Sequence, residues 1–276
     1  MSRIALGLLA TLVTSVVQAT GAPLRIDAAR SADAPPTQVD LYWRPAPLAG
    51  RRPVVLALHG CGGLFTRNGK AFDARYLEYT QMFHAAGWHV LLPDSFAGRS
   101  ICAETARERT VTVEDRRADV LAALAWVRAR DDVDPARIAL LGWSHGAMTA
   151  LNTVNAARSG YAQPLAGVAV FYPGCRELLA SPFKVAAPVL MQLGAKDDWT
   201  PARPCEALAQ AAQQHNATVP FELVVYPDAY HAFDSARPVR FRPEVANGRG
   251  AHAGGNPAAR AAAQARLMTF LHKVLQ

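Results

Sequence analysis

What this chain lacks narrows the range of functions it can have. Charged residues are sparse, at 18% of 276 residues against 51% hydrophobic ones, and this composition is typical of a globular protein with a sizeable core. The net charge is +7, yet no long run of Lys or Arg occurs, so we do not expect nucleic-acid binding. Beyond residue 19 there is no uncharged apolar run of about 18 residues, so we expect no membrane span in the body of the chain.

Cysteine is scarce, and metal-binding patterns are missing. The four cysteines are never spaced as C-x-x-C, which argues against zinc ribbons and thioredoxin-type redox chemistry. The eight histidines are not at the spacing that metal-dependent hydrolases use for their ligands. We therefore predict that the protein uses no metal and no cofactor.

Residues 1–19 have the pattern of an export signal. Arg3 supplies a positive charge, an apolar stretch follows from Ile4 to Val17, and Val17-Gln18-Ala19 fits the small-x-small rule for cleavage. Cleavage after Ala22 and a retained N-terminal anchor are the alternatives. We expect a periplasmic or secreted protein in which residues 20–276 form one domain.

Short apolar runs alternate with helical patterns from residue 53 to the end of the chain. This alternation predicts an α/β fold with a mostly parallel sheet and helices on both of its faces. Two alternating segments before it, Leu24–Ala28 and Thr37–Trp43, predict an N-terminal β-hairpin. Asp134-Pro135 is expected to interrupt the chain before the strand at 137–142. The main strands are predicted at 52–60, 88–92, 137–142, 165–172, 188–194 and 221–227, and the helices at 70–87, 113–130, 146–159, 201–215 and 256–275.

The motif Gly142-Trp143-Ser144-His145-Gly146 lies between a predicted buried strand and a predicted helix. G-x-S-x-G in this context indicates a nucleophile elbow, a tight turn that projects the serine hydroxyl above the sheet. The glycines are needed because a Cβ at either position would collide with a neighbouring element. Ser144 is therefore the candidate nucleophile.

A serine hydroxyl needs a base, and the base needs an acid to orient it. Such groups gather where parallel strands end, and His231 follows the last predicted strand, whereas Asp197 and Asp198 both follow the strand before it. Spacing alone does not choose between the two aspartates, since Asp198 also suits the role of helix cap. We expect five other histidines to be structural or exposed, without a matching acid: His84, His89, His215, His252 and His272.

The oxyanion of an acyl-transfer intermediate needs backbone N–H donors. The glycine-rich turn His59-Gly60-Cys61-Gly62-Gly63 follows a buried strand, so the Cys61 N–H is the first candidate donor, although an ordinary tight turn is the alternative. The N–H of His145, next to the nucleophile, is the second candidate. We expect His145 to contribute this N–H rather than its side chain.

The chain resembles the dienelactone hydrolase family of α/β-hydrolases from about residue 40 to 276. The resemblance is carried by HGCGG (59–63), LLPDSF (91–96), GWSHG (142–146), GAKDDWTP (194–201) and YHAF (230–233). It implies the α/β-hydrolase fold and a Ser144, His231 and Asp197 triad, because the family's G-x-x-D with a later proline matches Gly194, Asp197 and Pro201. The family's name-giving member has a cysteine where this chain has Ser144, and its glutamate near the oxyanion loop has no match here.

This departure favours a general carboxylic-ester or lactone hydrolase that acts through an acyl-enzyme on a small-molecule substrate. The alternatives are a polymer- or carbohydrate-directed esterase, of the cutinase or acetylxylan esterase type, and a non-catalytic hydrolase-like binding protein. A peptidase of this fold usually carries a large gating domain, for which this chain has no room. The natural substrate, the acyl-chain preference and the oligomeric state are left open.

Export to an oxidising compartment suggests disulfides among the four cysteines. We predict a Cys175–Cys205 bond, because both residues follow strands on the same side of the sheet, and a Cys61–Cys102 bond between two loops. Four free thiols are the alternative. Residues 235–255 form a long connection that is either a lid or an ordinary loop.

Overall fold

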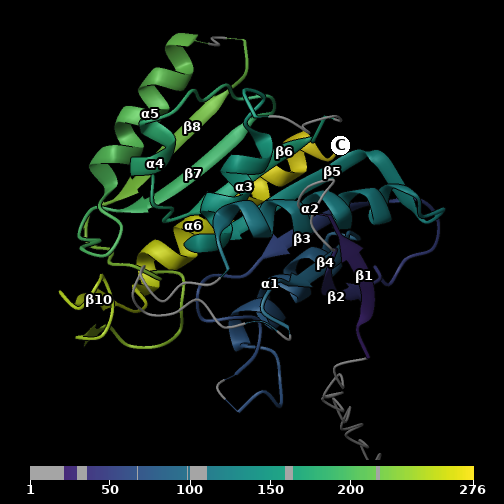
Figure 1. Cartoon of the computed structure of the whole chain (residues 1–276), viewed down its shortest axis with the longest axis horizontal. Coiled ribbons are helices and arrows are strands. Elements are labelled where there is room, and N and C mark those ends of the chain that lie inside the picture. Colours follow the sequence, from purple (N-terminus) through teal and green to yellow (C-terminus); the bar gives the residue numbers. More distant parts are fainter. Residues whose placement is uncertain are drawn as a thin grey trace, which may run out of the picture.

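The structure is a computed structural model that describes residues 22–29, 36–66, 68–97, 99, 111–158, 164–215 and 218–276. An eight-stranded sheet with the order β1-β2-β4-β3-β5-β6-β7-β8 runs through the molecule (Figure 1). Its strands are β1 (Leu24–Ala28), β2 (Thr37–Arg44), β3 (Arg52–Leu58), β4 (His89–Asp94), β5 (Val133–Trp143), β6 (Gly167–Phe171), β7 (Val189–Gly194) and β8 (Phe221–Tyr226).

The strands β3 to β8 are mutually parallel, and β1 and β2 form an antiparallel hairpin at one edge of the sheet. The α/β fold and the N-terminal hairpin are therefore confirmed. β5 begins at Val133, so the strand is longer than predicted, and the interruption predicted at Asp134-Pro135 is a break in its pairing. Pro135 has no N–H to donate, and the β5 pairing with β3 accordingly passes from Val133 directly to Ile138.

Helices cover both faces of the sheet because successive side chains of each strand point to opposite sides. Leu56 and Leu140 belong to the apolar layer under α2, α3 and α5, whereas Val55 and Ala139 belong to the layer under α1 and α6. The helices are α1 (Ala74–Ala85), α2 (Val113–Arg128), α3 (His145–Val154), α4 (Arg176–Leu179), α5 (Ala202–His215) and α6 (Pro257–Val274).

Side-chain caps fix the first residues of α2 and α6. The Thr112 side chain accepts from the Asp115 N–H while the Asp115 side chain accepts from the Thr112 N–H, a capping box that begins α2. The Asn256 side chain accepts from the Ala259 N–H, and Pro257 is the first residue of α6. No helix within the described part of the chain has the length and apolarity that crossing a membrane requires.

Residues 235–255, the possible lid, contain two short strands that were not predicted. β9 (Arg240–Arg242) and β10 (Ala251–Ala253) pair as a hairpin at one end of the molecule (Figure 1). The hairpin is attached to the rest of the fold, because the Gly254 N–H donates to the His231 carbonyl over 2.8 Å. The predicted signal at 1–19 and Cys102 lie outside the described residues.

Candidate active site

Ser144 occupies the turn between β5 and α3 with φ 51° and ψ −115°, in the left-handed region that non-glycine residues rarely adopt. A Cβ at Gly142 would collide with the Gly146 carbonyl, and one at Gly146 with the Leu58 carbonyl of β3. Strand, strained serine and helix therefore follow one another as the sequence predicts. The turn leaves Ser144 partly exposed, while the residues on either side of it are buried.

Three predicted residues meet at the ends of three strands. His231 Nε2 lies 3.1 Å from Ser144 Oγ, and His231 Nδ1 lies 2.8 Å from Asp197 Oδ2. Ser144 follows β5, Asp197 follows β7, and His231 lies five residues beyond the end of β8. Both the imidazole and the carboxylate are almost fully buried. The result is a continuous hydrogen-bonded series from hydroxyl to carboxylate.

The loop after β7 separates the roles of the two neighbouring aspartates. Asp197 Oδ1 accepts the N–H groups of Trp199 and Thr200 at 2.9 and 2.8 Å, and Oδ2 accepts the Thr200 hydroxyl at 3.0 Å. These donors hold the carboxylate against His231. Asp198 instead contacts His252 on β10, at 2.7 Å from its Nδ1, so the expectation that His252 has no acidic partner is wrong.

Aromatic rings hold the His231 imidazole in place. The centroids of the Tyr172 and Trp199 rings lie 4.5 and 4.6 Å from that of His231. Tyr172 has a positive φ of 41°, and its carbonyl accepts the Thr200 hydroxyl over 3.1 Å. The His231 imidazole is therefore oriented by packing as well as by Asp197.

The glycine-rich turn after β3 lies against Ser144. A Cβ at Gly60 would lie 3.5 Å from the Ser144 Cβ, which places the turn containing Cys61 beside the elbow. His145 is buried, and its Nδ1 lies 2.9 Å from Arg116 Nη1. Because arginine only donates, His145 Nδ1 is the acceptor and the ring is neutral. This side chain is thus occupied away from Ser144, and the roles of the Cys61 and His145 N–H groups as oxyanion donors stay predictions.

Asp234 is a supporting residue that sequence patterns did not indicate. Its buried carboxylate accepts from Tyr79, Tyr172 and Trp143 at 3.1, 2.7 and 2.9 Å, and Arg75 lies 3.2 Å away. Burial, together with this carboxylate, raises the pKa of Tyr79 well above its usual range. The cluster ties the residue before Ser144 to the segment that carries His231. Its only sequence signal is its position three residues after the histidine.

The three described cysteines are in disulfides, and the predicted Cys175–Cys205 bond is confirmed. Cys175, after β6, and Cys205, in α5, form a disulfide with a Cα–Cα distance of 5.0 Å. Cys61 is also disulfide-bonded, and the partner predicted for it, Cys102, lies outside the described residues. No cysteine of the described part of the chain is a free thiol.

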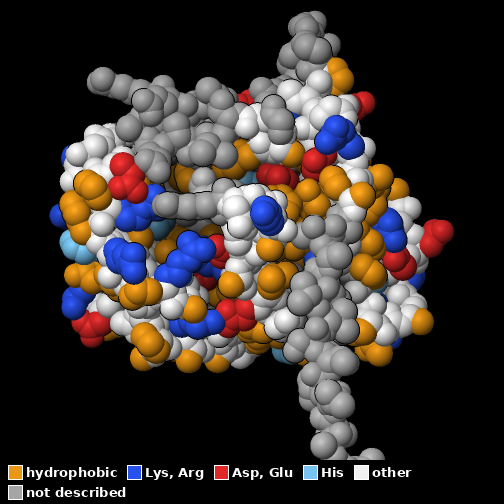
Figure 2. All heavy atoms as spheres, turned by 90° about the horizontal axis from the view of Figure 1, so that it is seen from below, with side chains coloured by type: hydrophobic (Ala, Val, Ile, Leu, Met, Phe, Trp, Pro, Cys, Tyr) orange, Lys and Arg blue, Asp and Glu red, His pale blue; other side chains and the backbone are white. Residues whose placement is uncertain are grey.

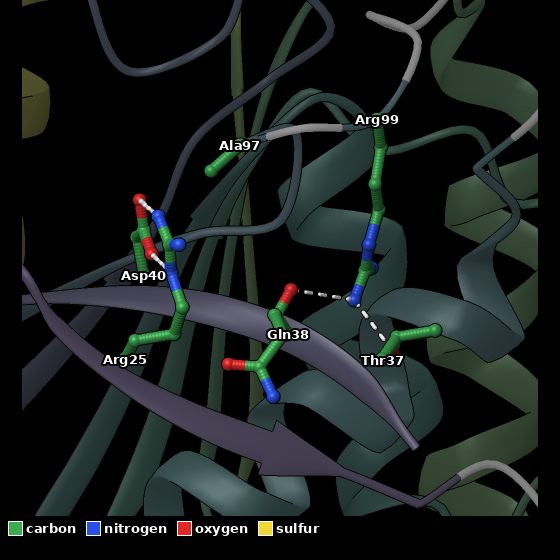
Figure 3. Close-up of a pocket in the computed structure, with 6 residues that line it drawn as sticks. All are labelled: Arg25, Thr37, Gln38, Asp40, Ala97 and Arg99. Atoms are coloured by element: carbon green, nitrogen blue, oxygen red, sulfur yellow. Dashed lines mark hydrogen bonds and ion pairs between the residues drawn. The ribbon is translucent and has the colours of Figure 1, made fainter. Parts of the chain in front are cut away.

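Within the ranges that the structure describes, we find no second group of polar side chains arranged like the one at Ser144. Figure 3 shows a cavity beside the β1–β2 hairpin, lined by Arg25, Asp40 and Arg99, in which Arg25 is paired with Asp40 at 2.7 Å. Arg99 is paired with Asp119 at 2.8 Å. On the face shown in Figure 2, Lys and Arg side chains lie near acidic ones, except at the left, where several Lys and Arg side chains gather. Among the described residues no group of His, Cys, Asp and Glu is arranged to hold a metal ion.

The fold and this arrangement are those of an α/β-hydrolase, and comparisons with known proteins agree. The crystal structure of a Klebsiella pneumoniae protein, described as a candidate dienelactone hydrolase, superimposes on this chain with a TM-score of 0.63 at 18% identity. The superposition covers 91% of this chain and 99% of that one. Esterase 2 of the planctomycete Thermogutta terrifontis with bound propionate gives 0.60 at 19% identity, covering 92% and 95%. The same esterase phosphoramylated by tabun gives 0.61 at 18% identity, covering 92% and 96%.

Sequence comparison defines the family more narrowly. Residues 42–275 match the dienelactone hydrolase family, and the chain belongs to that family. Uncharacterized proteins from two strains of Mycobacterium tuberculosis are 31% identical over 206 residues, which cover 69% of this chain. The match spans 66% of those relatives, just under two thirds of their length.

Proposed function

We propose that the protein is a serine hydrolase that cleaves carboxylic esters or lactones through a Ser144, His231 and Asp197 triad. The observation that carries the proposal is the hydrogen-bonded series from Ser144 Oγ through the His231 ring to Asp197. Membership of the dienelactone hydrolase family supports it. Ser144 takes the place of the cysteine found in the family's name-giving member.

The geometry supports a two-step mechanism. His231 Nε2 takes the Ser144 proton as Oγ attacks the carbonyl carbon, and Asp197 stabilises the resulting imidazolium through Nδ1–H. The N–H groups of Cys61 and His145 then bind the oxyanion, each contributing about 3–4 kcal/mol to the barrier reduction. The protonated His231 gives its proton to the leaving alkoxide, which leaves an acyl-enzyme. Water, activated by the same imidazole, releases the acid.

We propose small esters as substrates and an exported, periplasmic or secreted location. The propionate-bound Thermogutta esterase 2 supports short acyl groups, since it shares this fold over most of the chain. The N-terminal pattern and the disulfide-bonded cysteines Cys61, Cys175 and Cys205 support export.

Covalent labelling tests the assignment directly. The purified protein is incubated with a fluorophosphonate and assayed with p-nitrophenyl esters of increasing chain length. We expect labelling at Ser144, fastest turnover with short acyl chains, and loss of both in Ser144→Ala with unchanged circular dichroism. Turnover retained by that variant, or a folded wild-type protein that neither reacts nor hydrolyses any ester, would refute the triad.

A further inference from the structure

Arg116, on the first turns of α2, is a buried cation that reaches both sides of the nucleophile. Its side chain is among the largest that are fully buried, at 1% exposure. Nη2 donates to the His59 carbonyl over 2.7 Å, and Nη1 donates to His145 Nδ1 over 2.9 Å. His59 lies two residues before Cys61, and His145 directly follows Ser144. One guanidinium thus contacts both segments that carry the proposed oxyanion donors.

The chemistry of arginine makes this contact a rigid one. The guanidinium is planar, and its N–H groups diverge at fixed angles, so two acceptors bound to its two terminal nitrogens are held at a fixed separation. A lysine ammonium on a flexible stem has no such fork. The turn after β3 and the start of α3 are 86 residues apart in sequence, counted from His59 to His145. They also pack on each other directly, because a Cβ at Gly146 would collide with the Leu58 carbonyl, and Arg116 adds a polar link to this contact.

The spacing between these segments matters for the proposed reaction. Backbone donors stabilise an oxyanion only when they lie about 2.7–3.1 Å from the position that the charged oxygen will occupy. A shift of either segment moves one donor out of this range while leaving substrate binding largely intact. Burying a guanidinium carries a desolvation cost that a purely apolar contact would avoid.

The surroundings of Arg116 suit this role. Its guanidinium carbon lies 5.3 Å from the centre of the Phe96 ring, which packs in turn on the His59 imidazole. Burial and the nearby Arg116 charge both lower the pKa of His59 well below its usual value, so that ring stays neutral. Arg116 therefore donates to neutral acceptors on both segments and stacks on Phe96, while Asp94 and Asp119 are close enough to be attracted by its charge.

We propose that Arg116 is a positioning residue that sets the distance between the two backbone donors of the oxyanion hole. This inference rests on the proposed hydrolase function. It concerns the spacing of the donors and adds no bond-making step to the mechanism.

The test separates transition-state stabilisation from substrate binding in the full-length protein. Arg116→Met removes the fork and keeps a long apolar side chain, whereas Arg116→Lys keeps the charge without the fork. The matched control is Arg117→Met, because Arg117 also links α2 to α3, but through the Asn152 carbonyl at 3.1 Å, seven residues beyond His145. The readouts are kcat, KM and inhibition by an alkyl trifluoromethyl ketone. That ketone forms a hemiketal with a reactive serine, and the hemiketal oxyanion occupies the same hole.

We expect Arg116→Met to lower kcat by about 100- to 1000-fold, the range expected for loss of one oxyanion donor, with KM changed less than about threefold. Ketone affinity should fall by a factor similar to that in kcat. Arg116→Lys should retain only part of the wild-type kcat and ketone affinity. In Arg117→Met, both quantities should stay within about threefold of the wild-type values.

Several results would overturn the proposal. Wild-type kcat and ketone affinity in a folded Arg116→Met protein would do so, and so would a fall in kcat with unchanged ketone affinity. If Arg116→Met does not fold, Arg116→Lys decides, because full activity in that variant shows that the fork is unnecessary. A wild-type protein without Ser144-dependent hydrolysis would refute the proposed function itself. Failure of the Arg116 proposal alone gives a different result, because the wild type then hydrolyses esters and the Arg116 variants do so equally well.

Discussion

At the scale of single residues, Asp197 and Asp198 are adjacent carboxylates with separate environments. The Asp197 side chain is 1% exposed and bonded to His231, whereas the Asp198 side chain is 43% exposed and bonded to His252. Although the two aspartates are adjacent in sequence, they therefore need not share a function. Only the carboxylate that holds the base should matter for the chemistry.

Asn substitutions distinguish the two aspartates. Asp197→Asn keeps the shape of the side chain but removes the charge that stabilises imidazolium and favours the reactive tautomer, so kcat should fall by about 10⁴-fold. Asp198→Asn should leave kcat within a few-fold of the wild type. Steady-state hydrolysis of a p-nitrophenyl ester measures both, and a larger loss in Asp198→Asn would transfer the role of orienting acid to that residue.

His59 should make the stability of the protein depend on pH. Its side chain is fully buried, and burial with the Arg116 charge holds its pKa well below the usual 6.5. Asp94 Oδ1 lies 3.6 Å from Nε2, beyond hydrogen-bond distance, so its attraction does not reverse this shift. Below pH 6.5 the unfolded chain binds a proton at His59 that the folded protein does not bind. Stability from this residue is therefore lost as the pH falls.

Between pH 7.5 and 5.5 this linkage amounts to about 1.4 kcal/mol. His59→Asn preserves a donor near the Gly60 carbonyl, which His59 Nδ1 contacts at 2.8 Å, but does not titrate. Urea unfolding at the two pH values should show a smaller loss of stability in the variant than in the wild type, by about that amount. Equal losses in the two proteins would mean that the folded protein protonates His59 normally.

Residues with a local signature were predictable, and residues held by distant contacts were not. Ser144 has its glycines on either side, and His231 follows a strand in the expected order. Asp234 instead acts through Trp143 and Tyr79, which are 91 and 155 positions away. A carboxylate with no neighbouring pattern cannot be distinguished from a surface aspartate before the chain is folded.

At the scale of elements, the Cys175–Cys205 disulfide joins the segment after β6 to α5, the helix that follows the acid-bearing loop. The two cysteines are 30 residues apart in sequence. Closing a loop of that length removes entropy from the unfolded chain, which corresponds to about 3–4 kcal/mol of stability in the chain-entropy model. The bond therefore stabilises the elements beside Asp197.

Replacing both Cys175 and Cys205 by Ala should lower the free energy of unfolding by about 3–4 kcal/mol. Urea denaturation of the oxidised proteins measures the difference. A reducing agent should destabilise the wild type further than the double variant, because only the wild type has this bond to lose. Equal stability of the two oxidised proteins would show that the bond does not constrain the unfolded chain as expected.

Long elements with regular periodicity were predictable, and short ones were not. The helix at 113–128 carries both a capping box and an apolar face, and its observed end lies within two residues of the predicted one. β9 and β10 are three residues each, and they pair with one another in a segment whose sequence shows no alternation. Their placement depends on contacts with His231 and Asp198, which no local pattern encodes.

At the scale of the whole molecule, the order of the sheet explains why the site was predictable. β5, β7 and β8 are parallel members of one sheet, so their carboxyl ends lie at the same edge. Ser144, Asp197 and His231 follow those strands in turn. Any chain that keeps this strand order brings the three side chains together, although they are separated by 53 and 34 positions in the sequence.

The same sheet predicts that residues 20–276 unfold as one unit. Two apolar layers, one under α1 and α6 and one under α2, α3 and α5, share the strands between them. Loss of either layer exposes one face of β3, β5 and β6, so neither layer is stable without the other. Differential scanning calorimetry of residues 20–276 with intact disulfides should give a single transition, with calorimetric and van't Hoff enthalpies that agree. Two resolved transitions would instead divide the chain into independently stable parts.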